Sequence, residues 1–129
     1  MTRLTVLAGV SEPGGAKNIA LVAKEFGQKA VFKIFSSKGA TQILQRTGLA
    51  FEQADQIEQL SEARELLYVV RPTVILTGRG IQPNSLERLL VRAARDIGIP
   101  SVGLIDEWYD YRENYSDKTG SWDSLPNII

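Results

Sequence analysis

The chain has 129 residues, which is enough for one domain with a full hydrophobic core because domains cluster at roughly 100–150 residues. It contains no cysteine and no histidine, which excludes disulfides, thiolate chemistry, the usual zinc sites and Ser–His or Cys–His catalytic pairs. Its 15 basic and 15 acidic residues cancel, which argues against a nucleic-acid partner held by a basic surface. No apolar run approaches the roughly 20 residues of a membrane span and no signal-peptide core is present, so the default location is the cytoplasm.

The first segment predicts a strand, a glycine turn and a helix. Residues 4–10 are almost continuously apolar, as expected for a parallel strand covered on both faces. The sequence Ser-Glu-Pro-Gly-Gly follows at 11–15, and apolar residues then recur at helical spacing from Ala16 to Phe26. Such a turn gathers backbone N–H groups and the positive end of a helix dipole, so it predicts a site for an anion or a polar ligand.

Strands and helices alternate along the rest of the chain. Apolar runs predict further strands at 30–35, around Phe51, at 73–77 and at 101–105. Helical spacing predicts helices at 40–47, at 60–70 and from Asn84 to Gly98. In the last of these helices we expect Asn84 to be the cap and Glu87 to occupy the capping-box position.

This alternation predicts an α/β, three-layer Rossmann-like domain with a parallel sheet of about five strands in the order 3-2-1-4-5. Ligands of such folds bind outside the carboxyl ends of the strands, where the strand order reverses. The turns at 11–15 and 78–80 are predicted to meet there. The chain's last residues, 125–129, resemble the opening of another strand, so we expect either a short edge strand or the N-terminal part of a longer two-domain chain.

The first turn does not match a known nucleotide motif. Lys17 lies two residues too late for a phosphate-binding loop, and Asn18 replaces the hydroxyl that would hold magnesium. A G-x-G-x-x-G fingerprint is also absent, so no cofactor and no metal are predicted. The candidate ligand contacts in this turn are Ser11, Glu12, Gly14, Gly15 and Asn18. The alternative is that the glycines only allow a tight turn and close packing of helix on strand.

The second turn places an arginine between two glycines. The candidate ligand contacts here are Thr77, Gly78, Arg79, Gly80 and, at the start of the next helix, Ser85. An arginine can hold a carboxylate or a phosphate through two parallel hydrogen bonds. The alternative is a solvent-facing Arg79 that pairs with an acid such as Asp106 or Glu12 and contributes little stability.

The third candidate segment, 106–115, is acidic and aromatic. Five of the chain's ten aromatic residues fall within 108–122, where the hydrophobic pattern predicts a loop. Aromatic rings beside carboxylates are suited to holding sugar rings, and Tyr and Trp carry polar groups of their own. The same residue types are enriched at protein interfaces, so docking of a second domain or a homodimer through 106–122 remains an equal alternative.

Several segments together resemble the N-terminal domain of two-domain glycosyltransferases of the GT-B fold and of the related UDP-sugar 2-epimerase-like proteins. The resemblance is carried by the strand–turn–helix start and by residues 71–78, 85–101 and 106–112. It implies that this domain forms the acceptor side of an interdomain cleft whose other domain grips a nucleotide-sugar. It implies a cleft lined by Ser11, Gly14, Gly15, Gly78 to Gly80 and Asp106 to Arg112. The sequence departs from the family in showing neither a second domain nor a histidine base.

We therefore predict the acceptor- or sugar-binding half of a GT-B-like glycosyltransferase. The candidate bases are Glu12, Asp106 and Glu107. Arg79 would hold an anion, and Trp108 and Tyr111 would stack on a sugar. Arg112 is a further candidate ligand contact. A carboxylate serves as the base only if burial raises its pKa. The alternatives are a free-standing Rossmann-like domain that binds a small ligand or a protein without catalysis, and a regulator that binds a small anion.

Overall fold

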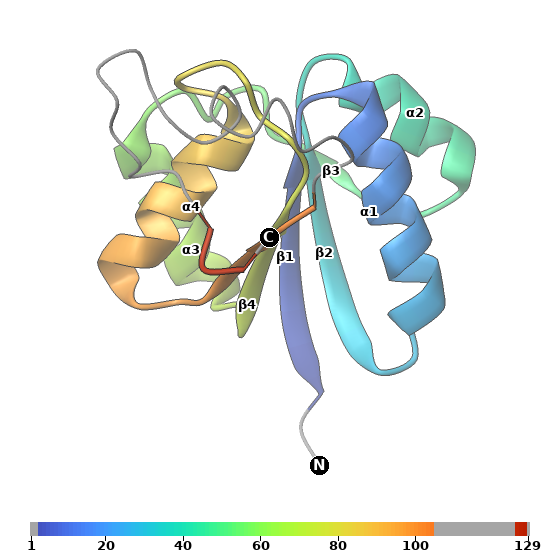
Figure 1. The fold of residues 1–129 in the computed structure, drawn as a ribbon, viewed down its shortest axis with the longest axis horizontal. Coiled ribbons are helices and arrows are strands. Elements are labelled where there is room, and N and C mark those ends of the chain that lie inside the picture. Colours follow the sequence, from blue (N-terminus) through green and yellow to red (C-terminus); the bar gives the residue numbers. More distant parts are fainter. Residues whose placement is uncertain (1–2, 105–125, 129) are drawn as a thin grey trace.

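The computed structural model describes residues 3–104 and 126–128 and has the predicted α/β architecture (Figure 1). Its strands are β1 (Leu4–Val10), β2 (Ala30–Ser36), β3 (Glu52–Gln53), β4 (Val74–Thr77) and β5 (Ser101–Gly103). Its helices are α1 (Pro13–Phe26), α2 (Ala40–Thr47), α3 (Leu60–Val70) and α4 (Leu86–Ile97). The sheet order is β3-β2-β1-β4-β5 and every neighbouring pair is parallel, which confirms the predicted topology.

Two hydrophobic cores lie on opposite faces of the sheet. Helices α1 and α2 cover one face and helices α3 and α4 cover the other (Figure 1). Because successive side chains of a strand point to opposite faces, Val6, Ala8 and Val10 of β1 enter the first core while Leu7 enters the second. Central strand β1 is therefore apolar along both faces, which explains its continuous hydrophobic sequence.

Helix α1 begins earlier than the sequence predicts. It starts at Pro13, a residue suited to the first helical position, so Gly14 and Gly15 lie in its first turn rather than in a turn before it. A Cβ atom added to Gly78, just after β4, would lie 2.9 Å from the Cα atom of Gly15. The two glycines therefore let the start of α1 contact the exit of β4 backbone to backbone.

The N-terminus of α4 also differs from the prediction. The cap is Ser85 rather than Asn84, and the Ser85 hydroxyl accepts a hydrogen bond from the backbone N–H of Arg88 at 3.3 Å. The third helical residue is consequently Arg88, so Glu87 is one residue too early for a capping box. The other end agrees with the prediction, because Gly98 ends the helix in the left-handed conformation with φ of 91°.

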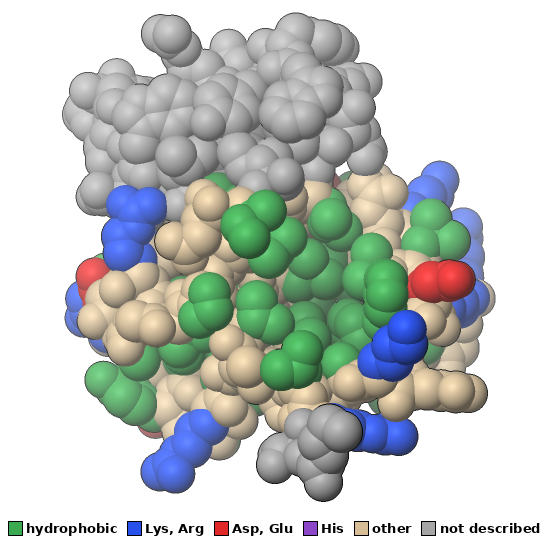
Figure 2. All heavy atoms as spheres, turned by 60° about the horizontal axis from the view of Figure 1, so that its bottom comes forward, with side chains coloured by type: hydrophobic (Ala, Val, Ile, Leu, Met, Phe, Trp, Pro, Cys, Tyr) green, Lys and Arg blue, Asp and Glu red, His purple; other side chains and the backbone are tan. Residues whose placement is uncertain are grey.

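The free edge of β5 carries a short parallel extension. Ile128 pairs with Val102, and the backbone N–H of Gly103 donates to the Ile128 carbonyl at 2.6 Å. Figure 2 shows hydrophobic side chains gathered across the middle of one face of the molecule, with Lys and Arg side chains toward its rim. Among the described helices, none has the length and the apolar character needed to cross a membrane.

Candidate functional site

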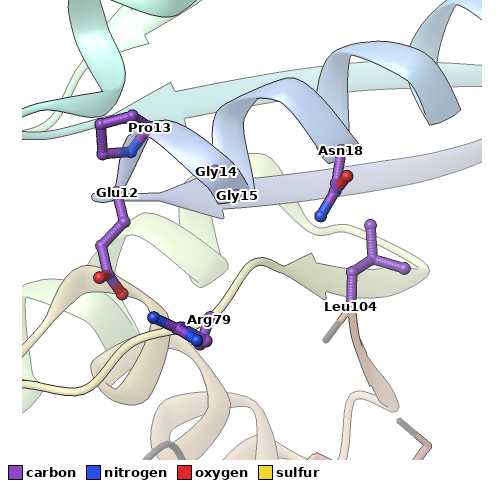
Figure 3. A pocket seen from close by; sticks show the side chains of 7 residues that line it. All are labelled: Glu12, Pro13, Gly14, Gly15, Asn18, Arg79 and Leu104. Atoms are coloured by element: carbon purple, nitrogen blue, oxygen red, sulfur yellow. The ribbon is translucent and has the colours of Figure 1, made fainter. Parts of the chain in front are cut away.

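A pocket of about 200 Å³ lies at the carboxyl ends of the central strands (Figure 3). It is built from the start of α1, the loop after β4 and the end of β5. Its lining residues are Glu12, Pro13, Gly14, Gly15, Asn18, Arg79 and Leu104. The strand order reverses between β1 and β4, so this is the place where a parallel α/β sheet is expected to bind a ligand.

The N-terminus of α1 forms one wall of the pocket. Glu12 occupies the cap position, but its side chain makes no capping hydrogen bond. The first backbone donor to enter the helical pattern is Ala16, whose N–H donates to the Glu12 carbonyl at 3.0 Å. Pro13 has no N–H, so the amides of Gly14 and Gly15 are the donors that this helix end leaves without an intrahelical partner. Together with the helix dipole they favour a negatively charged group in the pocket.

Glu12 and Arg79 supply opposite charges. Figure 3 shows their side chains pointing toward one another across the pocket, while Asn18 and Leu104 approach each other from its other end. The Oε2 atom of Glu12 is buried and has no hydrogen-bond partner among the residues that the structure describes. The Glu12 side chain lines the pocket and can accept a hydrogen bond from a ligand hydroxyl, while the Arg79 guanidinium is suited to an anion.

Ser11 binds within the protein instead of lining the pocket. Its backbone N–H donates to Oε2 of Glu87 at 2.8 Å, and its hydroxyl donates to Oε1 of the same side chain at 2.6 Å. Burial raises the pKa of Glu87 from its ordinary value of 4.5 to about 7; the bonds from Ser11 lower it, and the charge of Glu12 raises it. The sequence did not single out Glu87 for this role, because the contact joins residues 76 positions apart.

The other predicted residues of the second turn lie beneath or beside the pocket. Thr77 is 1% exposed, and its hydroxyl oxygen has no hydrogen-bond partner within the described ranges. Gly78 contacts Gly15, Gly80 accepts a hydrogen bond from Nε of Arg88 at 2.6 Å, and Ser85 caps α4. Only Arg79 of this group lines the pocket, and the structure adds Pro13 and Leu104, which the sequence analysis did not select.

The aromatic segment lies outside the described residues. Asp106, Glu107, Trp108, Tyr111 and Arg112 therefore remain predictions from the sequence. Within residues 3–104 and 126–128, no group of three or more acidic side chains is placed to hold a metal ion.

No protein-family model matches the chain, and no curated protein matches it in sequence. Several solved structures are similar to it in fold, among them three 2-epimerases. A putative UDP-N-acetylglucosamine 2-epimerase from Listeria monocytogenes superposes with a TM-score of 0.68 at 11% identity, over 95% of this chain and 36% of that one. A UDP-GlcNAc 2-epimerase from Neisseria meningitidis, bound to UDP-GlcNAc, superposes with a TM-score of 0.63 at 14% identity, over 94% of this chain and 38% of that one. A further UDP-N-acetylglucosamine 2-epimerase superposes with a TM-score of 0.62 at 13% identity, over 88% of this chain and 38% of that one.

The chain has the fold of one part of these 2-epimerases. This confirms the resemblance to UDP-sugar 2-epimerase-like proteins at the level of the fold. The chain spans only 36–38% of the length of the structures it matches, so their activity does not transfer with the fold.

Proposed function

We propose that this chain is one α/β half of a GT-B-like enzyme acting on sugar nucleotides, and that the pocket beside α1 binds the sugar or a phosphate group of the ligand. The observation that supports this most directly is that two side chains of opposite charge, Glu12 and Arg79, line one pocket beside the uncapped start of α1. A carboxylate suits sugar hydroxyls, and an arginine beside free backbone amides suits a phosphate.

The size of the pocket agrees with a partial site. Pockets that enclose a whole small-molecule ligand usually measure about 300–1,000 Å³. The pocket of about 200 Å³ is smaller and has room for one group of a sugar nucleotide. A second domain closing over it would supply the remaining contacts, as in the cleft that the resemblance implies.

In a glycosyl transfer Glu12 and Arg79 would have different roles. Glu12, which lines the pocket, would take the proton of an acceptor hydroxyl, the acceptor oxygen would form the new bond to the sugar, and the nucleotide would leave with the electrons of the broken bond. Arg79 would stabilise negative charge on a phosphate of the ligand. Asp106 and Glu107 remain the alternative bases.

The test is calorimetric titration of the full-length protein with UDP-GlcNAc, UDP and inorganic pyrophosphate. Arg79→Gln should weaken binding at least about tenfold, because a charge-assisted hydrogen bond is worth about 1.5–3 kcal/mol. Arg46→Gln, which removes an exposed arginine from the last turn of α2, is the matched control and should leave binding unchanged. Equal affinities of the two variants, or no binding of any of the three probes, would contradict the proposal.

Turnover separates this proposal from a binding module. When each is combined with the second domain that the proposal requires, the wild-type protein should release UDP from UDP-GlcNAc in the presence of simple sugars, and Glu12→Gln should not. Tight binding with no release of UDP would favour the free-standing binding domain instead.

A further inference from the structure

Two consecutive charged side chains are buried in the first turn of α4. Glu87 and Arg88 are each 2% exposed, and Arg88 is among the largest fully buried side chains among the described residues. Taking charged groups out of water costs several kcal/mol per ion, and replacing buried charges by apolar side chains often leaves a protein equally stable or more so. Fold stability alone therefore does not account for charge at these two positions.

Each of the two side chains holds the backbone of a different pocket loop. Glu87 accepts hydrogen bonds from the N–H and the hydroxyl of Ser11, in the loop between β1 and α1. Arg88 donates from Nε to the carbonyl of Gly80, in the loop between β4 and α4. Ser11 directly precedes Glu12, and Gly80 directly follows Arg79.

The loop after β4 is seated closely on the same helix turn. A Cβ atom added to Gly80 would lie 2.5 Å from the Ser85 hydroxyl oxygen and 3.0 Å from the Cβ atom of Glu87. The first turn of α4 thus touches one loop through packing and through Arg88, and the other through Glu87. Neither Glu87 nor Arg88 lines the pocket.

We infer that Glu87 and Arg88 are positioning residues that set the separation of Glu12 and Arg79, and thereby the affinity of the pocket for an anionic sugar nucleotide. The inference rests on the proposed function for its ligand. The link from α4 to the two loops is independent of that ligand, because it consists of contacts within the chain.

Two substitutions at residue 87 separate positioning from plain packing. Glu87→Gln keeps both contacts, because its carbonyl accepts from the Ser11 N–H and its amide donates to the Ser11 hydroxyl. Glu87→Leu fills a similar volume and loses both contacts. In the full-length protein we expect UDP-GlcNAc to bind Glu87→Gln within about threefold of wild type and Glu87→Leu at least tenfold more weakly, with both variants folded by circular dichroism.

The control is a variant that lowers stability without removing a hydrogen bond to either pocket loop. Leu67→Ala removes a buried core side chain of α3 that does not line the pocket, and it should lower the melting temperature while leaving the affinity for UDP-GlcNAc unchanged. If Glu87→Leu binds like wild type, or Glu87→Gln is as weak as Glu87→Leu, the inference is wrong.

Amide hydrogen exchange of the unliganded protein makes the inference testable apart from the proposed function. Exchange at residues 11–15 should speed up in Glu87→Leu and remain at the wild-type rate in Glu87→Gln, with no difference in α3. Wild-type protein that binds no probe but shows this exchange pattern would overturn the proposed function and leave the positioning role standing. Unchanged exchange at residues 11–15 in Glu87→Leu would overturn the positioning role.

Discussion

Two helix N-termini reach the same edge of the sheet and are built in opposite ways. Helix α1 starts at Pro13 after Glu12, whose side chain makes no capping bond, and its first amides face a pocket. Helix α4 starts after Ser85, whose hydroxyl accepts from the Arg88 N–H, and its first turn is buried with both charged side chains engaged. One helix end, the open end, borders a pocket, and the other, the closed end, is buried and hydrogen-bonded within the protein.

Under the proposed function, this difference separates a helix end that binds a ligand from a helix end that supports the binding loops. The donors of an uncapped helix attract an anion only if they are left free, which costs the helix stability. The capped helix lacks such donors and supplies rigid contacts to the neighbouring loops. The following experiments change one end at a time, so each of them either removes the difference or measures it.

Ionisation of Glu87 should have the largest effect on the closed end. Its pKa is about 7 in the folded protein and 4.5 ordinarily, so between these values the folded chain holds more protons than the unfolded chain. The free energy of unfolding should therefore fall as the pH rises from about 4.5 to 7, by up to about 3 kcal/mol from this group.

Urea unfolding at pH 5 and pH 7.5 measures this effect. Glu87→Gln cannot ionise at residue 87, so it should lose less stability than wild type between the two pH values. The same loss in both proteins would show that Glu87 ionises normally in the folded state.

Gly78→Ala should disturb the contact that joins the open end to the sheet. The added Cβ atom would lie 2.9 Å from the Gly15 Cα atom, so backbone must shift, at a cost of about 1–3 kcal/mol in the free energy of unfolding. Gly15→Ala places its Cβ atom 3.3 Å from the Gly78 Cα atom and should cost less. Thermal unfolding of the two variants compares them directly, and an equal cost would argue against a tight contact.

Removing the cap of α4 should cost about 1 kcal/mol. Ser85→Ala removes the hydroxyl that accepts a hydrogen bond from the Arg88 N–H, and the loss of an N-cap usually destabilises a protein by about this amount. Asn84→Ala is the matched control, because Asn84 is the neighbouring residue and does not cap the helix. In chemical unfolding, Ser85→Ala should have a lower free energy of unfolding than Asn84→Ala. The reverse order would indicate that Asn84 is the cap.

Capping the open end should have the smallest effect and the opposite sign. Glu12 has extended backbone with φ of −117° and ψ of 147°, which suits a serine cap. Glu12→Ser should raise the free energy of unfolding by about 0.5–1 kcal/mol and weaken binding of UDP-GlcNAc. If Glu12→Ser is no more stable than wild type and binds UDP-GlcNAc equally well, this helix end is not held open for a ligand.

The fold was predictable because local patterns specify it. Apolar runs and helical spacing alternate, and Gly48 and Gly98 both adopt the left-handed conformation that ends a helix. The start of α1 was predicted too late because two glycines favour a turn locally. The lack of a side chain at Gly15 is explained by its close contact with Gly78, which is distant in sequence.

The pocket lies where the strand order predicts a crevice, but the contacts that support its loops were not predicted. Glu12 and Arg79 lie shortly after the ends of β1 and β4. These two strands are neighbours in the sheet, so the two residues could be expected to lie close together. The bond between Ser11 and Glu87 joins residues 76 positions apart, and no local pattern distinguishes it from a helix cap. Such contacts depend on tertiary packing, which one sequence does not reveal.

Because Gly15 and Gly78 touch through their backbones, no flexible side chain lies between them to absorb a displacement. Tilting of α1 toward the sheet would therefore press on the exit of β4, where the Gly78 N–H donates to the Gly9 carbonyl at 3.3 Å. A molecule that pushes on one loop thus pushes mechanically on the next strand of the sheet.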